Sequence, residues 1–416
     1  MNSTRDERLR IELVENDPAA EVALTPRQAQ HLGDSGVITA TPTLRPGRWM
    51  VAPDRYVGIA TLGDVEVSIR PKLPIRRLMF LLGYAYDLTA WRDDPVGAAA
   101  DDDLLSAVAT AFARQAQRAV EQGLLQGYRD TEEAAVVLRG RLRTDDQLRG
   151  HFGLPIPLEI RYDDYTVDIA ENRILRTAAE RLLRLPRLHA TTRRTLLRLV
   201  RTLADTQPLP RGSGIPAWQP SRLNARYHPA LRLGELVLRG GSFEHADGHT
   251  IVDGFLVDMA RLFEQFLTVA LREALAGRGG TVDGQNTLRL DTEGAITIRP
   301  DILWRKNGAV AAVVDAKYKA GKSNAYPNAD VYQMLTYCTR LGLATGHLVY
   351  AKGESVPGRA RILGTDLVLV RHALDLDTTP DALLSQIVDL AAAIAADAHL
   401  PSRRSPATGP NHHLRN

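Results

Sequence analysis

The sequence predicts a mixed α/β (α+β) protein of several domains, and three observations predict it. At 416 residues the chain is too long for one ordinary hydrophobic core. The first hundred residues are mainly strand-like, the middle is mainly helical and basic, and the last part alternates strands with helices. We therefore predict a β-rich N-terminal domain over 1–100, a mixed, mainly helical region over 101–245, an α/β domain with a central mixed sheet over 246–400, and a disordered tail over 401–416.

The composition is that of a folded, soluble protein. Hydrophobic residues make up 44% and charged residues 24% of the chain, as in most globular proteins. The net charge of +3 neither requires nor excludes a nucleic-acid partner. The sole cysteine, Cys338, excludes an internal disulfide and fits a reducing compartment. Because residues 1–17 do not resemble a signal peptide and no run of about 18 apolar residues occurs, we expect a cytoplasmic protein without a membrane span.

In the N-terminal part, alternating and capped segments define the predicted elements. RLRIELVE (8–15) alternates as a strand does, and YVGIATLGDVEVSIRPKL (56–73) reads as a hairpin. TPRQAQHLG (25–33) predicts a helix, with Thr25 as its cap and a proline in its first turn. RRLMFLLGYAYDL (76–88) predicts a second helix, which the acidic segment PVGAAADDD (95–103) follows.

The middle of the chain is predicted to be helical, with two strands. Residues 104–123 form an alanine-rich helical pattern, and VVLRGRLR (136–143) and PLEIRYDDYTVD (157–168) are strand candidates. A long helical region over 171–203 is interrupted at LRLPRLH (183–189). It carries nine arginines: Arg173, Arg176, Arg181, Arg184, Arg187, Arg193, Arg194, Arg198 and Arg201. They form either a solvated helical face or a surface for DNA phosphates or an acidic partner protein, and the sequence leaves both interpretations open.

The C-terminal part begins with VDGFLVDMARLFEQFLTVALREAL (252–275), which we predict to be one long amphipathic helix. Two loop-like stretches, 207–221 and 239–250, precede it. Strands and helices then alternate, and the segments are TLRLDTEGAITIRPDILW (287–304), AVAAVVDAKYK (309–319), DVYQMLTYCTRLG (330–342), HLVYA (347–351) and RILGTDLVLV (361–370).

Acidic and basic residues stand at the end of one buried strand in this part. Asp315, Lys317 and Lys319 are two residues apart, so they project to one side of a strand whose preceding residues are all apolar. Asp301 ends the neighbouring strand, and the short turn over 305–308 pairs the two strands. The pairing brings Asp301 close to Asp315. Two buried carboxylates repel each other, and a divalent cation relieves the repulsion.

The ligand types favour Mg²⁺, with Mn²⁺ as the ion expected to substitute for it. Asp301, Asp315 and the backbone carbonyl of Ala316 offer hard oxygen ligands. Lys317 would orient the attacking water or stabilise charge in the transition state. Glu264, within ARLFEQFL, either completes the acidic cluster as a further ligand or is an ordinary solvated helix residue.

Other residues offer less to a catalytic scheme. Gln333 and Tyr337 share one helix face and either support the same site, as Lys319 would, or pack routinely. No histidine lies near Cys338 in sequence, and the histidines lack the spacing of zinc ligands. The chain has no Gly-x-x-x-x-Gly-Lys-Ser/Thr motif, so we do not expect it to hydrolyse a nucleotide by itself.

Pro300-Asp301 followed by Asp315-x-Lys317 resembles the motif of the PD-(D/E)xK nucleases. Together with YVGIATLGDVEVSIRPKL, LRGRLR, YTVDIAENRILRTAAERLL, LFEQFL and YQMLTY, it makes the chain resemble the McrC family, the nuclease subunit of McrBC-type restriction systems. Val57-Gly58, Pro71-Lys72 and Asn172-Arg173 separate this family from other such nucleases.

The resemblance implies a restriction-endonuclease-like fold for 246–400 and catalytic roles for Asp301, Asp315, Lys317 and Glu264. It also implies a partner, an McrB-like AAA+ GTPase hexamer, which the regions 1–100 and 101–245 would bind, and a substrate of double-stranded DNA carrying 5-methylcytosine. Two other functions stay open at this point: a non-catalytic activator of a ring ATPase, and a RecB-like nuclease that acts alone.

Overall fold

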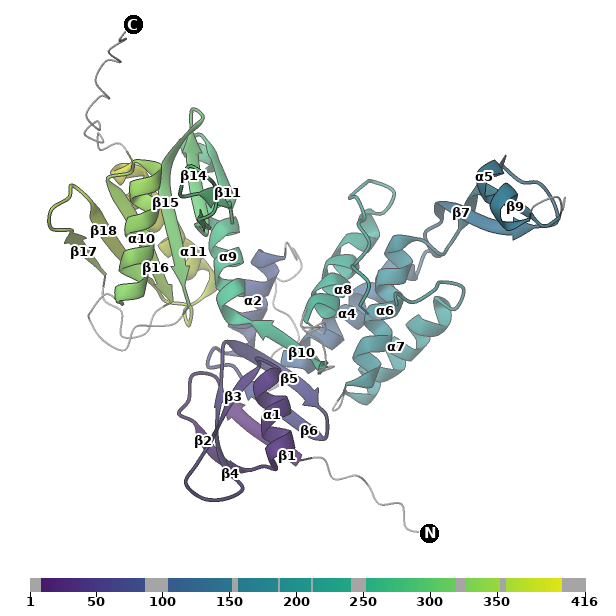
Figure 1. Cartoon of the computed structure of the whole chain (residues 1–416), viewed down its shortest axis with the longest axis horizontal. Coiled ribbons are helices and arrows are strands. Elements are labelled where there is room, and N and C mark those ends of the chain that lie inside the picture. The colour runs from purple at the N-terminus through teal and green to yellow at the C-terminus, as the bar shows by residue number, and fades with distance from the viewer. Residues whose placement is uncertain are drawn as a thin grey trace, which may run out of the picture. The chain divides into compact units, whose positions relative to one another are not determined.

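The computed structural model describes residues 9–86, 104–151, 156–185, 188–210, 212–240, 252–318, 327–351 and 357–398 (Figure 1). It divides into two compact units, one of Met1–Ile75 with Tyr86–Val257 and one of Arg76–Ala85 with Asp258–Asn416. Both units combine sheets with helices, which confirms the mixed α/β class. The predicted boundaries at 100, 245 and 400 stay predictions, and the acidic segment 95–103 and the tail 401–416 lie outside the described residues.

Two small sheets and a capped helix open the first unit. The first sheet has the strand order β1-β6-β5-β10, and the second has the order β2-β4-β3. Thr25 caps α1 in a reciprocal capping box with Gln28, as its position before a proline predicts. The elements are β1 (Leu9–Val14), β2 (Ala20–Ala23), α1 (Pro26–Asp34), β3 (Ile38–Pro42), β4 (Arg48–Pro53), β5 (Tyr56–Leu62), β6 (Val65–Arg70) and β10 (Val252–Asp258).

The strand β10 corrects the prediction of one helix over 252–275. Residues up to Asp258 form a strand beside β5, and the helix α9 (Met259–Leu275) begins only after it. A Cβ atom on Gly254 would lie 2.4 Å from the Ile59 carbonyl oxygen, so the strands approach closely because this residue is glycine. The Asp258 side chain accepts the Arg261 N–H and caps α9.

A group of helices forms the middle of the first unit. It consists of α4 (Leu104–Val120), α6 (Ala170–Arg184), α7 (Ala190–Thr202) and α8 (His228–Gly240), which pack on one another through buried aliphatic residues. The predicted interruption of the long helical region is confirmed, because α6 ends before Pro186 and α7 starts after His189.

A three-stranded sheet with one short helix follows α4 in sequence, and we call it the arm. It comprises β7 (Gly127–Ala135), β8 (Arg141–Leu142), α5 (Thr144–Gly150) and β9 (Leu158–Thr166), in the order β7-β9-β8. The strand predicted over 136–143 is mostly wrong, because only Arg141–Leu142 pair with β9. The main partner of β9 is β7, which the sequence analysis missed because its polar residues on both faces give no apolar alternation.

The second unit is built around a six-stranded mixed sheet in the order β11-β14-β15-β16-β18-β17. The helix α10 packs on β15 and β16, while α11 packs on α9, β15 and β18 (Figure 1). Phe80 and Tyr84 of α2 (Ile75–Ala85) pack against Phe266 of α9. The remaining elements are β11 (Thr281–Gly284), β12 (Leu288–Arg289), β13 (Thr297–Ile298), β14 (Ile302–Lys306), β15 (Ala309–Lys317), α10 (Asn328–Leu341), β16 (Thr345–Ala351), β17 (Gly358–Arg361), β18 (Val368–Leu374) and α11 (Pro380–Asp397).

Among the helices that the structure describes, none has the length and apolar character needed to cross a membrane.

Candidate functional site

A tight turn places the two predicted acids side by side. Asn307 and Gly308 both have positive φ, 52° and 81°, which lets β14 turn back on β15. Ile302 lies opposite Val314 in this antiparallel pair, so the preceding residue, Asp301, falls opposite Asp315. Asp301 therefore stands just before β14 and not at the end of a strand, as the sequence analysis had placed it.

Asp301 is held against β15 by the backbone. Its Oδ2 atom accepts a hydrogen bond from the Ala316 N–H at 2.8 Å. Burial, and then the neighbouring charges of Asp315 and Glu264, raise the pKa of Asp301 from 3.8 to about 8. A proton or a cation must therefore accompany this carboxylate at neutral pH.

Asp315 is almost fully buried, with 1% of its surface exposed. Its Oδ2 atom lies 2.6 Å from Lys317 Nζ. Within the described part of the chain, neither of its carboxylate oxygens has a hydrogen-bond partner. A buried carboxylate oxygen without a hydrogen-bond partner is destabilising, so Oδ1 indicates a position where a further positive group would be bound.

Lys317 begins a chain of hydrogen bonds that runs along α10. Its Nζ atom donates to Gln333 Oε1 at 2.8 Å, Gln333 Nε2 donates to the Tyr337 hydroxyl at 2.8 Å, and that hydroxyl donates to the Arg299 carbonyl oxygen at 3.1 Å. Burial lowers the pKa of Lys317, but the charges of Asp315, Asp330 and Asp301 raise it by more, so the ammonium form is favoured. The structure thus brings Gln333 and Tyr337 to the lysine.

Two further residues reach the same lysine and were missed by the sequence analysis. Asp330 Oδ1 lies 3.5 Å from Lys317 Nζ, and Asp330 Oδ2 accepts the hydroxyl hydrogen of Tyr350 at 2.7 Å. Asp330 precedes Gln333 by three residues, so the helical spacing that singled out Gln333 and Tyr337 could also have found it. Tyr350 could be predicted only with the knowledge that β15 and β16 pair in parallel.

Glu264 lies on α9 and is half-buried. Burial raises the pKa of its carboxyl group, a hydrogen bond with Gln285 and the charge of Arg299 lower it, and the charge of Asp315 raises it again, so that the net shift is upward. Among the described residues, no group of three or more His, Cys, Asp or Glu side chains has the spacing of a metal-ion cluster. The ligand roles of Asp301, Asp315, Glu264 and the Ala316 carbonyl and the catalytic role of Lys317 therefore stay predictions. Lys319 lies outside the described residues.

Cys338 is part of the core under the site. Burial raises the pKa of its thiol to about 12, so the nucleophilic thiolate form is suppressed. The residue is fully buried on α10 and packs in one hydrophobic cluster with Leu303, Val313 and Tyr337.

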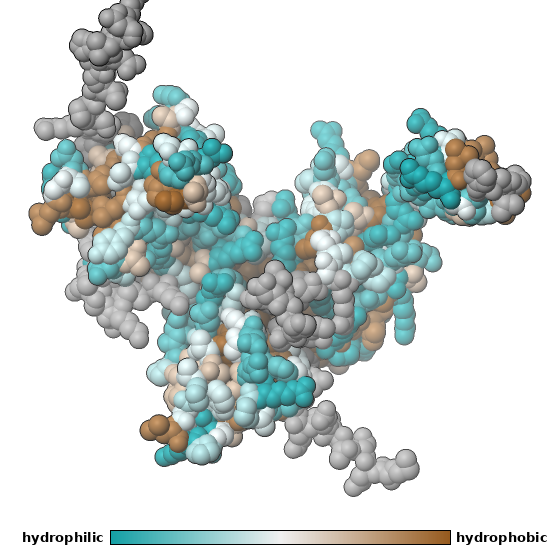
Figure 2. Space-filling view, in the orientation of Figure 1, coloured by the Kyte–Doolittle hydropathy of each residue, from teal (hydrophilic) through white to brown (hydrophobic). Residues whose placement is uncertain are grey.

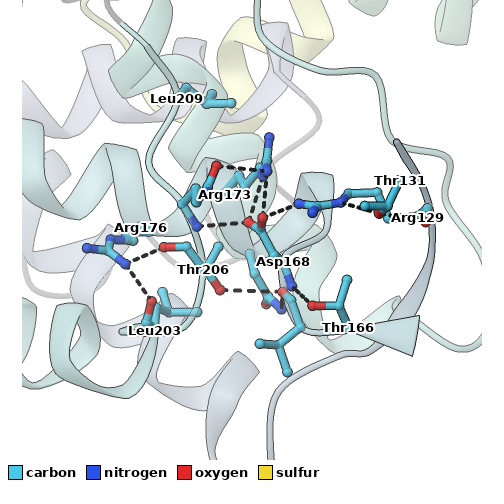
Figure 3. Close-up of polar contacts among 12 residues, drawn as sticks. Arg129, Thr131, Thr166, Asp168, Arg173, Arg176, Leu203, Thr206 and Leu209 are labelled. Carbon is cyan, nitrogen blue, oxygen red and sulfur yellow. Dashed lines mark hydrogen bonds and ion pairs between the residues drawn. The ribbon is translucent and has the colours of Figure 1, made fainter. Parts of the chain in front are cut away.

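The base of the arm contains a second cluster of charged residues, centred on Asp168 (Figure 3). Arg129 of β7 and Arg173 of α6 both pair with its carboxylate, and the Gln207 N–H donates to Asp168 Oδ1 at 2.8 Å. Burial raises the pKa of Asp168, but the hydrogen bonds from Arg173 and Gln207 lower it by more, and the net shift is downward. Asp168 thus joins the arm to the helices.

The predicted arginine surface divides into two groups. On α6, Arg176 donates to the carbonyl oxygens of Leu203 and Thr206 (Figure 3). Arg181 donates to that of Leu238, so these side chains join α6 to other segments. On α7, the exposed arginines are Arg193, Arg194, Arg198 and Arg201. Arg184 of α6 is exposed as well, and Arg187 lies outside the described residues. The exposed arginines keep the two interpretations of the sequence open.

With the geometry established, the family of the chain can be assigned. The family model described as McrBC 5-methylcytosine restriction system component matches residues 51–351. This chain belongs to the McrBC family. The match includes the β5–β6 hairpin of the first unit as well as Asp301, Asp315, Lys317 and Gln333 of the second.

A solved structure shares the fold of this McrBC-family chain. A chain of the refined half-complex from a tetradecameric assembly of Thermococcus gammatolerans McrB AAA+ hexamers with bound McrC matches with a TM-score of 0.57 and 19% identity, over 92% of this chain and 99% of that one. A chain of the cryo-EM structure of the Thermococcus gammatolerans McrBC complex matches with a TM-score of 0.38 and 20% identity, over 64% and 88% respectively. No curated protein gave a significant match.

Proposed function

We propose that this McrBC-family chain is the DNA-cleaving subunit of a restriction complex, a metal-dependent endonuclease of the PD-(D/E)xK type. The observation that carries the proposal is the pair of Asp301, which is partly buried, and Asp315, which is almost fully buried, next to Lys317. A purely structural site has no physical reason to retain two adjacent buried carboxylates, because their mutual repulsion and desolvation destabilise the fold.

The carboxylate pair fits a divalent cation. Asp315 Oδ1 is buried without a hydrogen-bond partner in the described chain, and the pKa of Asp301 is raised first by burial and then by the negative charges of Asp315 and Glu264. Mg²⁺ is commonly held by one or two carboxylates and keeps several waters, so Asp301 and Asp315 are a sufficient protein donor set. The Ala316 carbonyl and Glu264 would add to it, and Mn²⁺ would substitute. When bound, the ion polarises the phosphodiester and makes a bound water more acidic.

The remaining side chains of the site would bind the substrate or the attacking water and orient Lys317. Lys317 carries its positive charge at the edge of the carboxylate pair, where it would hold a phosphate oxygen or the attacking water and stabilise charge in the transition state. Gln333 accepts a hydrogen bond from the Lys317 ammonium group and so fixes its direction. Gln333 is held in turn by the Tyr337 hydroxyl, which the Arg299 carbonyl oxygen anchors. This support is what keeps a catalytic group within the small tolerance that catalysis demands.

The partner we propose is an McrB-like AAA+ hexamer whose GTPase activity this chain stimulates. The chain shares its fold with a chain of an assembly in which McrB AAA+ hexamers have McrC bound. Family membership supports double-stranded DNA with 5-methylcytosine as the substrate, with cleavage following nucleotide-driven translocation by the ring.

The arm is the surface that we propose for docking. Among the described residues of the arm, Ile160 is the only buried hydrophobic one, whereas several large apolar side chains are exposed, and Figure 2 shows apolar surface on the arm. The exposed set is Tyr128, Val136, Val137, Leu138, Leu142, Leu148, Ile156 and Tyr165. A small sheet that exposes this many apolar residues is typical of a binding surface.

One experiment tests the function and separates it from a purely activating role. The protein is mixed with its ring ATPase, 5-methylcytosine-containing plasmid, GTP and Mg²⁺, and wild type is compared with Asp315→Ala and with Asp366→Ala, which changes an exposed aspartate of the same unit. We expect Asp315→Ala to abolish cleavage while GTP hydrolysis is still stimulated, and Asp366→Ala to behave as wild type. Stimulation without cleavage by the wild type would show an activator, and cleavage without the ring would show a nuclease that acts alone.

A further inference from the structure

The ammonium group of Lys317 has three acceptors, and the third of them has no role in the scheme above. Its Nζ atom lies 2.6 Å from Asp315 Oδ2, 2.8 Å from Gln333 Oε1 and 3.5 Å from Asp330 Oδ1. A lysine ammonium carries three N–H donors. One hydrogen bond, to Gln333, and two ion pairs, to Asp315 and Asp330, therefore hold the group from its own strand and from α10.

Asp330 is itself fixed by a residue of the neighbouring strand. The Tyr350 hydroxyl donates to Asp330 Oδ2 at 2.7 Å, and Tyr350 is 1% exposed. Tyr350 is the register partner of Lys317 in the parallel pair of β15 and β16, so both side chains rise from the same face of the sheet. One carboxylate oxygen of Asp330 thus faces the tyrosine and the other faces the lysine.

A simpler role for Asp330 explains only part of this geometry. An aspartate in the first turn of α10 interacts favourably with the helix dipole, and a buried tyrosine hydroxyl needs some acceptor. Neither requirement directs the second carboxylate oxygen toward Lys317. We propose that Asp330, held by Tyr350, is a positioning residue that fixes the Lys317 ammonium group in the cleavage site, a role that rests on the proposed nuclease function.

The unequal distances of the three contacts indicate how Asp330 would act on Lys317. The 3.5 Å contact is the longest of the three and the weakest, since the attraction between opposite charges weakens with distance. Lys317 can therefore turn an N–H toward a phosphodiester oxygen or the attacking water while its contacts with Asp315 and Gln333 are kept. Asp330 holds the third donor in place until the substrate arrives, so its loss should slow the reaction of bound DNA and leave DNA binding unchanged.

The test uses the complete complex with its ring ATPase, GTP, Mg²⁺ and methylated plasmid. Tyr350→Phe removes only the hydroxyl group, and Tyr332→Phe removes the same group from a tyrosine of α10 that is 65% exposed. Asp330→Ala removes both carboxylate contacts, whereas Asp330→Asn keeps an oxygen acceptor. The cleavage rate at saturating DNA, the DNA concentration for half-maximal rate, GTP hydrolysis and the unfolding temperature are measured for each variant.

We expect Asp330→Ala to lower the saturated cleavage rate by about tenfold to a hundredfold, the effect of a displaced catalytic group. Tyr350→Phe should lower it by a smaller factor, Asp330→Asn should restore part of the loss, and Tyr332→Phe should match wild type. The DNA concentration that gives the half-maximal cleavage rate and the rate of GTP hydrolysis should not change.

Three results would overturn the proposal. Wild-type cleavage by Asp330→Ala would leave the proposed function intact and remove the positioning role. A loss of rate that follows the unfolding temperature alone, with Asp330→Asn no better than Asp330→Ala, would show a structural role only. No cleavage by the wild type under any of these conditions would refute the nuclease function, and the positioning role with it.

Discussion

The Ala316 N–H donates a hydrogen bond to Asp301 Oδ2 across 2.8 Å, so one acid of the buried pair is tied to the strand that carries the other. Asp301 cannot move away from Asp315 without breaking this bond and leaving a strand amide unpaired. The repulsion between the two carboxylates must therefore be relieved where they stand, either by a proton or by a cation.

The first prediction concerns the pH dependence of stability without metal. Because the pKa of Asp301 rises from 3.8 to about 8 on folding, the folded protein keeps a proton that the unfolded chain has lost. The free energy of unfolding should therefore fall as the pH rises from about 4 to about 8, with a slope of at most about 1.4 kcal/mol per pH unit. Urea unfolding in EDTA at several pH values measures this free energy and its slope.

Asp301→Asn removes the carboxyl group whose titration causes the slope, so it tests the assignment to Asp301. It should flatten the slope and should make the metal-free protein more stable than wild type near pH 8, while abolishing cleavage. Mg²⁺ should also flatten the wild-type slope, because it supplies the missing positive charge. An unchanged slope in Asp301→Asn would show that this carboxyl group does not titrate as its burial and neighbours indicate.

A second prediction replaces the metal ion. Ca²⁺ prefers six to eight oxygen ligands at longer distances and in looser geometry than Mg²⁺, so it should bind at Asp301 and Asp315 but position the water poorly. We expect DNA cleavage to be lost in Ca²⁺, to persist in Mn²⁺, and to return when Mg²⁺ is added in excess. Full cleavage in Ca²⁺ would contradict a Mg²⁺-type site.

A third prediction concerns the close approach of two strands in the first unit. Gly58 has φ +128°, and a Cβ atom there would lie 2.1 Å from the Phe255 carbonyl oxygen. Gly58→Ala should therefore destabilise the protein by about 2–4 kcal/mol through steric conflict and backbone strain. Gly33→Ala is the control, because nothing lies within 4 Å of its Cβ position, and a helical alanine should stabilise by about 0.5–1 kcal/mol. Thermal or urea unfolding compares the two.

The sequence was sufficient to predict the centre of the site because short, local segments determine its geometry. The Asn307-Gly308 turn and the apolar run before Asp315 determine which strands pair, and the pairing brings Asp301 beside Asp315. Helical spacing likewise singled out Gln333 and Tyr337. These features depend on neighbours within about one hairpin or one helix turn, so the sequence alone carries them.

The elements that the sequence analysis missed depend on contacts between distant segments. The Phe255–Val257 run fits a buried helix as well as a strand, and only the close approach of Gly254 to β5 selects the strand. The strand β7 is polar on both faces and is set by pairing with β9, for example through Asp130 and Arg161. The contact of Asp330 with Tyr350 requires α10 to lie over β16.

A fourth prediction concerns the Asp168 cluster. Asp168 is 6% exposed, and its removal would leave Arg129 and Arg173 facing each other without the carboxylate that joins them. We expect Asp168→Ala to lower the free energy of unfolding by about 2 kcal/mol, less than for a fully buried pair because both arginines are partly exposed. Arg198→Ala, an exposed residue of α7, should change stability by less than about 0.5 kcal/mol. Equal stability of the two variants would contradict a structural role for the cluster.

The last prediction concerns the exposed apolar residues of the arm. Val137 and Leu138 are 62% and 57% exposed and belong to no regular strand or helix, so their replacement by serine removes little buried surface. Val137→Ser with Leu138→Ser should therefore leave the unfolding temperature unchanged and strongly reduce both binding to the ring ATPase and stimulation of its GTP hydrolysis. Leu363→Ser, at a 96% exposed position of the second unit, is the matched control. Wild-type stimulation by the double variant would place the docking surface elsewhere, and a large loss of stability would show that these side chains pack within the chain.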